Sequence, residues 1–257
     1  EYETDAANVF YVRIDKNRKL PVTVLCRALG LSSDEEILNF FGEDERILAT
    51  LEKDTTKNQD EGLLEVYRKL RPGEPPTVES ATNQINMLFF DPRRYDLSRF
   101  GRYKMNKKLS LARRITGFVA AENIVAPLTG EIIVEAKGKI TRELAEKADA
   151  AGVDTVVLSI DGKKVKVITN GCVDAQGFFS FDVKECGINE RCSFDEIKKI
   201  LDTTSDVEEQ KEMLRRNHDQ LIGRTVTVKD ILSSINYLNG LGHGVGTTDD
   251  IDHLGNR

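Results

Sequence analysis

The sequence predicts a mixed α+β fold, in which helices and short strands form a main domain that is interrupted by a smaller α+β subdomain. Amphipathic helical patterns fill most of residues 20–90, and another one covers residues 227–239. A β-branched and aromatic run precedes them at residues 8–15. Strand patterns gather instead around an Asp-Gly pair at residues 161–162. The expected segments are residues 1–114 for the first part of the main domain, 115–217 for the inserted subdomain and 218–257 for the return of the chain.

The first elements follow from local signals. Residues 8–15 predict a strand, because β-branched and aromatic side chains suit a pleated surface. Residues 22–29 predict a helix that is opened by a proline and closed by a glycine. Ser33 and Glu36 form the pattern of a capping box before a helical stretch that reaches about residue 53. We expect these segments to be scaffold.

Two more helices flank a proline-rich connector. Residues 61–70 have a helical apolar stripe that ends where the prolines begin. Thr77 caps the next helix, whose apolar face we expect to pack inward. Three prolines within residues 72–76 restrict their own backbone and that of the preceding residues. Arg71 is therefore presented from a rigid connector.

The inserted subdomain and the return segment have signals of their own. Asp161 and Gly162 join two apolar runs in the pattern of a β-hairpin. Ser193 and Ser205 each precede a glutamate by three residues, which indicates two helix starts. The remaining expected elements are strands at residues 131–135 and 154–160, a helix at residues 141–150, and a last helix at residues 227–239 that stops at Gly240. The acidic bias of the insert argues against contact with nucleic acid.

The segment from Arg68 to Arg114 is the most basic part of an acidic protein. It holds twelve Lys and Arg against four Asp and Glu, a local net charge of +8, while the whole chain has −6 and the remainder therefore −14. Cations concentrated in this way favour a surface for a polyanion such as nucleic acid. An ordinary solvated face is the alternative interpretation. We expect Arg71, Arg94 and Arg102 to lie on one exposed basic surface, because each flanks an apolar face that turns inward.

Aromatic side chains are interleaved with these cations. The mixture is typical of sites where bases stack while phosphates are neutralised. Some of these rings must belong to the core, and we expect those to be Phe89 and Phe90. The aromatic residues of the segment are Tyr67, Phe89, Phe90, Tyr95, Phe100 and Tyr103.

The sequence excludes several classes of protein and site. No apolar run approaches the roughly 20 residues that span a bilayer, and no signal peptide opens the chain. The four cysteines are scattered without the spacing of a zinc site, which fits a reducing, cytoplasmic setting. The glycines lack the spacing of a P-loop, and no histidine has a plausible nucleophile beside it. We expect no catalytic residue, metal or cofactor in this chain.

One acidic cluster near the C-terminus, Asp249, Asp250, Asp252 and His253, suits a divalent metal, because hard cations favour clustered carboxylates. No partner carboxylates from a second segment accompany it. A structural cap of the loop and a contact to a nucleobase are the other two interpretations.

Several motifs together resemble one family. They are V-R-I-D-K-N-R-K-L-P-V-T at 12–23, R-P-G-E-P-P-T at 71–77, F-F-D-P-R-R-Y-D-L-S-R-F-G-R-Y-K-M-N at 89–106 and D-D-I-D-H-L-G-N-R at 249–257. In order and approximate spacing they resemble the lobe, or second domain, of the β subunit of bacterial DNA-directed RNA polymerase. The match is specific over roughly 8–31, 61–108 and 227–257, and weak over about 110–225.

The resemblance implies a non-catalytic lobe domain of a nucleotidyltransferase, which forms a wall of the DNA cleft and contacts the non-template strand and the downstream duplex. Its partners would be DNA, the other polymerase subunits and a sigma factor, in the cytoplasm at the nucleoid. The Mg²⁺ of such an enzyme is held by aspartates of the largest subunit. The resemblance further implies a pocket for an unpaired non-template base, built from Asp15, Asp250, Ile251, Asp252 and Arg257, with Arg13 beside it.

Two other functions stay open. A free-standing nucleic-acid-binding adaptor would use the same basic face, and a metal-dependent phosphohydrolase would use residues 249–253. The chain begins at Glu1 without an initiator Met and ends at Arg257 directly after a motif, so we expect an excised domain. Titration with Mg²⁺ or Mn²⁺ distinguishes the phosphohydrolase from the other two functions.

Overall fold

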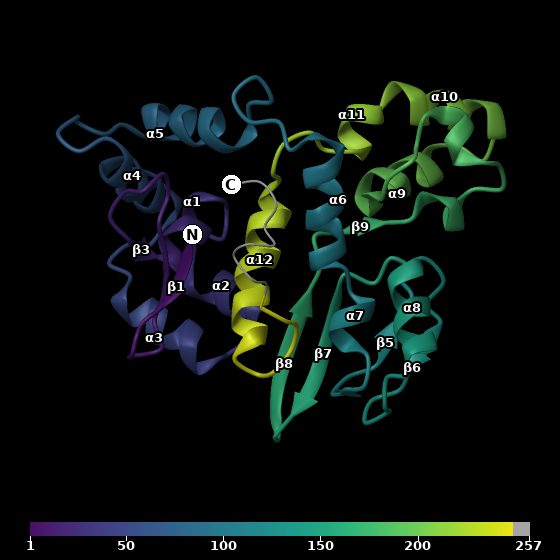
Figure 1. Ribbon diagram of the computed structural model, residues 1–257, viewed down its shortest axis with the longest axis horizontal. Helices are drawn as coiled ribbons and strands as arrows, with labels where there is room; N and C mark the ends of the chain where they lie inside the picture. The colour runs from purple at the N-terminus through teal and green to yellow at the C-terminus, as the bar shows by residue number, and fades with distance from the viewer. Residues whose placement is uncertain (249–257) are drawn as a thin grey trace. The chain divides into compact units, whose positions relative to one another are not determined.

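The computed structural model describes residues 1–248, which form two compact units (Figure 1). Unit 1 contains residues 1–96 and 225–228, and unit 2 contains residues 97–224 and 229–248 of the described chain. Helices predominate, and the strands form small sheets of two or three. The mixed α+β fold is therefore confirmed. The sequence also predicts that residues 115–217 are an insertion into the main domain. That boundary stays a prediction.

Unit 1 opens with a three-stranded antiparallel sheet in the order β1-β2-β3. Its strands are β1 (Tyr2–Thr4), β2 (Phe10–Val12) and β3 (Leu20–Pro21). The helices that follow are α1 (Val22–Ala28), α2 (Asp34–Phe41), α3 (Glu45–Lys53), α4 (Gln59–Leu70), α5 (Val78–Ile85) and the π-helix η1 (Asn86–Phe90). The expected caps are confirmed, since Ser33 accepts a hydrogen bond from Glu36 N and Thr77 accepts one from Ser80 N.

Helices α1 and α4 pack closely around one glycine and one arginine. A Cβ on Gly62 would lie 2.9 Å from both Ala28 N and Arg27 Cβ, so only glycine allows this approach. The Arg27 side chain is completely buried, with its Nε 3.1 Å from Asp54 Oδ2 and its Nη1 2.7 Å from Ser32 O. A buried guanidinium therefore ties α1 to the end of α3 and the start of α2.

Unit 2 begins with two helices and a set of short strands. They are α6 (Ser98–Leu109), α7 (Ala112–Ile115), β4 (Val119–Ala120), β5 (Ile124–Val125), β6 (Ile132–Val134), α8 (Arg142–Ala150), β7 (Thr155–Ile160) and β8 (Lys163–Ile168). Asp161 (φ 50°) and Gly162 (φ 76°) form the predicted hairpin turn between β7 and β8. Two positive φ angles in a two-residue turn match the right-handed twist of the flanking strands.

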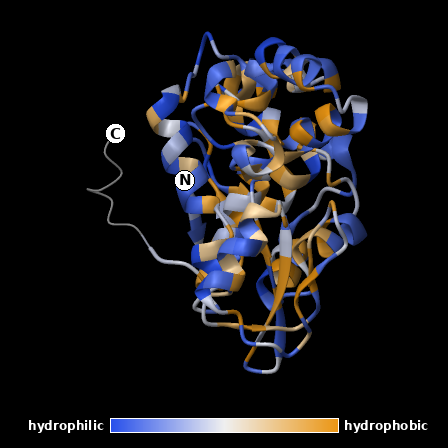
Figure 2. Cartoon of the chain, turned by 90° about the vertical axis from the view of Figure 1, so that its right-hand side faces the viewer, coloured by the Kyte–Doolittle hydropathy of each residue, from blue (hydrophilic) through white to orange (hydrophobic). Residues whose placement is uncertain are grey.

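The second half of unit 2 is mainly helical. Its elements are β9 (Cys172–Val173), η2 (Ala175–Phe178), η3 (Val183–Cys186), β10 (Cys192–Ser193), α9 (Phe194–Thr203), α10 (Val207–Arg216), α11 (His218–Leu221) and α12 (Val228–Leu241), whose first residue belongs to unit 1. Hydrophilic and hydrophobic residues alternate along its helices (Figure 2). One apolar core surrounds the β7–β8 hairpin, and a second one lies under α9, α10 and α11.

Three expected helix ends differ in detail. Ser193 precedes α9 without a side-chain cap, and α10 is capped by Asp206, which accepts from Glu209 N, instead of Ser205. Helix α12 continues past Gly240 to Leu241. A Cβ on Gly240 would lie 3.4 Å from Val245 Cβ, so this glycine allows the returning chain to come close and does not end the helix.

The four cysteines are free thiols with raised pKa values. Burial raises the pKa of Cys172 to about 11 and that of Cys192 to about 12, and it also raises the pKa of Cys26 and Cys186. Because the thiolate is the reactive form, we expect a disulfide reagent at pH 8 to modify the thiols only after unfolding. Since each folded-state pKa exceeds the ordinary value of about 8.5, stability should fall as the pH rises above that value. Rapid modification of the native protein would contradict this prediction.

Candidate nucleic-acid interface

Arg71 in unit 1 is exposed at the end of α4, on a connector that hydrogen bonds hold in place. Its backbone N–H donates to Tyr67 O at 2.8 Å, and its carbonyl accepts from Glu74 N at 3.3 Å. The Tyr67 hydroxyl donates to Glu74 Oε2 at 2.8 Å, and this bond raises the pKa of Tyr67. These bonds lie on both sides of Pro72 and hold the first part of the connector in place. The expected exposure of Arg71 is confirmed, and its contact with DNA stays a prediction.

Arg94 lies exposed on a turn that Asp91 organises. The Asp91 carbonyl accepts from Arg94 N and Tyr95 N, while its carboxylate accepts from the backbone and guanidinium of Arg93. Arg93 is the largest cause of the lowered pKa of Asp91. The guanidinium of Arg94 makes no hydrogen bond within residues 1–248. In this turn, Asp91 therefore neutralises Arg93, while Arg94 stays exposed to solvent.

Arg13 and Asp15 follow strand β2 in unit 1. Arg13 is half-buried and forms an ion pair with Glu3, whose Oε2 lies 3.3 Å from Arg13 Nε. Asp15 is exposed and has a φ of 53°, in the left-handed region that aspartate tolerates better than most residues. The pocket that the family resemblance implies around Asp15 also needs Asp250, Ile251, Asp252 and Arg257. Those four lie outside the described residues.

Arg102 is buried, so the prediction that it shares an exposed surface with Arg71 and Arg94 is wrong. It lies in unit 2, and its side chain is only 3% exposed. Its Nη1 lies 2.8 Å from Asp230 Oδ2, and its Nε donates to Gly223 O at 2.9 Å. A buried guanidinium requires a paired carboxylate, because an isolated charge in the interior is costly. Part of the positive charge in the basic segment is therefore neutralised inside the protein.

The aromatic residues of the basic segment also divide differently from the prediction. Tyr67 is buried, whereas Phe89 and Phe90 are half-buried. Tyr95, Phe100 and Tyr103 are more than half exposed. On α6, Lys104 lies 5.3 Å above the ring of Phe100 and Lys107 lies 5.8 Å above the ring of Tyr103. Helical spacing of aromatic and lysine side chains was the signal for this arrangement, since residues four apart share one face.

The described part of the chain has neither a metal-binding cluster nor a membrane-spanning helix. Within residues 1–248, no group of three or more His, Cys, Asp or Glu side chains could hold a metal ion. No helix of that part is long and apolar enough to cross a membrane. The acidic cluster at residues 249–253, which the phosphohydrolase alternative would need, lies outside it.

Comparison with known proteins assigns the family. Residues 1–125 and 175–257 match the family model of RNA polymerase Rpb2, domain 2. The unmatched residues 126–174 lie within the segment that the sequence predicts to be inserted. The whole chain also aligns with curated relatives that are called DNA-directed RNA polymerase subunit beta.

Three such relatives illustrate the similarity. The one from Acetivibrio thermocellus is 57% identical, the one from Clostridium beijerinckii 53% and the one from Clostridium acetobutylicum 50%. Each alignment covers 100% of this chain but 21% of the relative, so the chain spans about a fifth of their length. The match shows that the chain belongs to the family of RNA polymerase Rpb2 domain 2, and it confirms the resemblance to the β subunit of bacterial DNA-directed RNA polymerase.

Proposed function

We propose that the chain forms one wall of the DNA cleft of an RNA polymerase, where it contacts the non-template strand and the downstream duplex. Within that nucleotidyltransferase its role would be to position DNA, without catalytic residues of its own. The family match supports the view that the chain is part of an RNA polymerase. The observation that supports DNA contact is the exposure of Arg71 and Arg94 on held turns.

Three other arginines of unit 1 have acidic partners. Arg13 pairs with Glu3, Arg93 with Asp91, and the buried Arg27 with Asp54. Arg71 and Arg94 make no such pair within residues 1–248. A guanidinium that is exposed and held in place can bind a phosphate with little loss of conformational freedom.

Further partners follow from the same assignment. The chain would work in the cytoplasm at the nucleoid, together with the other polymerase subunits and a sigma factor. The Mg²⁺ of the intact enzyme would be held by another subunit. Asp15 would form one side of the pocket for an unpaired non-template base, with Arg13 beside it.

The double variant Arg71→Glu/Arg94→Glu in the intact polymerase tests the proposal. We expect shorter-lived promoter open complexes, because two phosphate contacts are replaced by repulsion. The slope of log K against log salt concentration should become less steep by roughly 0.9 for each lost phosphate contact. The measurement is complex lifetime over a series of salt concentrations.

Arg68→Glu is a matched control, since Arg68 is also exposed on α4 but already pairs with Glu65 at 3.2 Å. Its charge change equals that of each test substitution. A loss in the control that is half of the loss in the double variant would mean that only net charge matters, because the control carries half of the charge change. An unchanged lifetime in the double variant would exclude phosphate contacts at both positions.

A further inference from the structure

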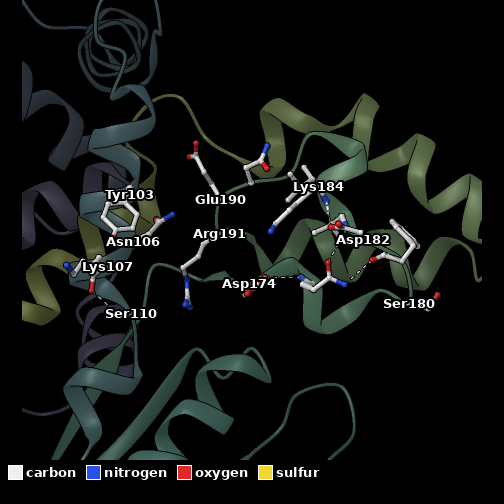
Figure 3. Close-up of a pocket in the computed structure, with 15 residues that line it drawn as sticks. Tyr103, Asn106, Lys107, Ser110, Asp174, Ser180, Asp182, Lys184, Glu190 and Arg191 are labelled. Carbon is white, nitrogen blue, oxygen red and sulfur yellow. Dashed lines mark hydrogen bonds between the residues drawn. The ribbon is translucent and has the colours of Figure 1, made fainter.

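Unit 2 contains a cavity of about 840 Å³ that the DNA-contact proposal does not use. Helix α6 forms one wall, and the segment 174–191 forms the others (Figure 3). The α6 side chains are Tyr103, Asn106, Lys107 and Ser110, whose spacing places them on one helix face. The volume falls within the range of about 300–1,000 Å³ that is typical of small-molecule sites. The chemistry of the walls therefore decides what could bind.

A buried hydrogen-bond network fixes the amide of Asn106. Asn170 Oδ1 accepts from Cys172 N, and Asn170 Nδ2 donates to Asp230 Oδ1 at 2.9 Å. Because these two bonds set the orientation of Asn170, its Nδ2 can meet only an acceptor on Asn106. The bond to Asn106 Oδ1 measures 2.9 Å. Asn106 must then direct its amide nitrogen away from the network.

That nitrogen points toward the segment with Glu190 and Arg191 (Figure 3). Asn106 is only 3% exposed, and its Nδ2 has no hydrogen-bond partner among the residues that the structure describes. Because Asn106 lines the cavity, a ligand or water there can accept from this nitrogen. The cavity wall thus contains one hydrogen-bond donor of fixed orientation, Asn106 Nδ2.

Glu190 offers the complementary acceptor. Its Oε1 accepts from Arg99 Nε at 2.6 Å, whereas its Oε2 is buried and has no partner within residues 1–248. Both unmatched groups belong to residues that line the same cavity. A ligand with a donor and an acceptor on adjacent atoms would satisfy both.

The remaining groups favour a planar, anionic ligand. The ring of Tyr103 is 57% exposed at the cavity, and Lys107 lies one turn further along α6. Lys184 extends from η3 on the opposite wall, without an ion-pair partner in the described chain (Figure 3). Of the five cations of α6, Arg99 and Arg102 pair with Glu190 and Asp230, and Lys107 lines the cavity. Asp174 and Asp182, also in the lining, cap η2 and η3 by accepting from Gln176 N and Lys184 N.

We infer that this cavity binds one nucleotide. The base stacks on Tyr103, its edge lies between Asn106 Nδ2 and Glu190 Oε2, and its phosphate is neutralised by Lys184. Adenine and cytosine fit this edge best, because each has an amino group next to an unprotonated ring nitrogen. The nucleotide is either free or part of a single strand. This inference does not depend on the DNA contacts of Arg71 and Arg94.

Fluorescence of 2-aminopurine tests the site, since this base loses fluorescence on stacking and the chain contains no tryptophan. The probes are the 2-aminopurine mononucleotide and a short single strand with one 2-aminopurine, each titrated with the full 257-residue chain. We expect quenching that AMP or CMP reverses at lower concentration than UMP. Quenching by the mononucleotide identifies a free nucleotide as the ligand, and quenching confined to the strand identifies a strand nucleotide.

Variants locate the binding. Tyr103→Ala should weaken binding by about tenfold or more, the worth of one base–aromatic stack. Tyr95→Ala removes a ring of similar exposure in unit 1 and should change nothing. Lys184→Glu should also weaken binding, whereas Lys198→Glu, the same change at an exposed position of α9, should not.

The absence of quenching with both probes would overturn the inference. Equal losses for Tyr103→Ala and Tyr95→Ala would overturn it as well, because binding would then not involve the cavity. Circular dichroism of each variant checks folding. Lys184→Glu keeps the test decisive if Tyr103→Ala alters the fold, because it changes the other wall.

Discussion

Replacing Asp230 by alanine should lower the stability of unit 2 by about 3–5 kcal/mol. The carboxylate is 1% exposed and lies 2.8 Å from the guanidinium of Arg102, which is itself 3% exposed. The substitution leaves that positive charge in the interior without its carboxylate, while Gly223 O still accepts from Arg102 Nε. Equilibrium urea unfolding measures the loss, and hydrogen exchange of unit 2 peptides locates it.

Two further variants separate the charge from the loss of packing. Arg102→Met/Asp230→Leu removes both charges, and it should recover a large part of the stability because apolar replacement of a whole buried pair is often neutral. Glu131→Ala deletes a carboxylate that pairs with Lys147 on the surface, and it should cost less than about 1 kcal/mol. A double variant as unstable as Asp230→Ala would mean that the pair stabilises unit 2 by its shape and hydrogen bonds.

Local signals predicted the elements of the fold well. Ser33 and Thr77 start helices because their hydroxyls accept from backbone N–H groups three residues later, which needs nothing beyond that turn. Asp161 and Gly162 form a hairpin because they tolerate positive φ angles. Such signals act within a few residues, so they are readable from one sequence.

The burial of Arg102 could not be read in the same way. Its carboxylate partner is 128 residues away in the sequence, and nothing within α6 indicates it. A charged residue between lysines looks like part of a solvated face. A weaker signal did exist in α12, where the polar residues Asp230, Ser233 and Asn236 recur at a spacing of three and are all buried. A polar stripe of that kind on an otherwise apolar helix indicates a polar partner.

The exposed residues of the candidate site were predictable only where neighbouring residues in the sequence determine their exposure. The prolines after Arg71 and the Asp91 turn before Arg94 hold these arginines outward by local geometry. The cavity beside α6 was not predicted, because its walls come from residues 103–110 and 174–191. The free amide of Asn106 depends in addition on Asn170 and Asp230. A hydrogen-bond network between residues that are far apart in the sequence can be recognised only in the three-dimensional structure.

Replacing Arg27 by methionine should lower the stability of unit 1 by about 3–5 kcal/mol, an effect as large as that of the Asp230 substitution. Methionine fills much of the space between α1 and α4 but leaves the completely buried carboxylate of Asp54 without its cation. Urea unfolding, together with hydrogen exchange of unit 1 peptides, measures the change. Arg68→Met is the matched control, since it removes an exposed guanidinium and should cost less than about 1 kcal/mol.

The double variant Arg27→Met/Asp54→Leu should recover less stability than the corresponding double variant in unit 2, where Asn170 Nδ2, which also donates to Asp230, keeps Asn106 Oδ1 as an acceptor. Asp54 Oδ1 also accepts from Thr56 N at 2.8 Å and from Thr56 Oγ1 at 2.6 Å, so removing it leaves two buried donors near the end of α3. A buried donor without an acceptor costs about 1–3 kcal/mol. Full recovery in the double variant would show that water or a shifted backbone satisfies Thr56, and that Asp54 serves only as the counterion of Arg27.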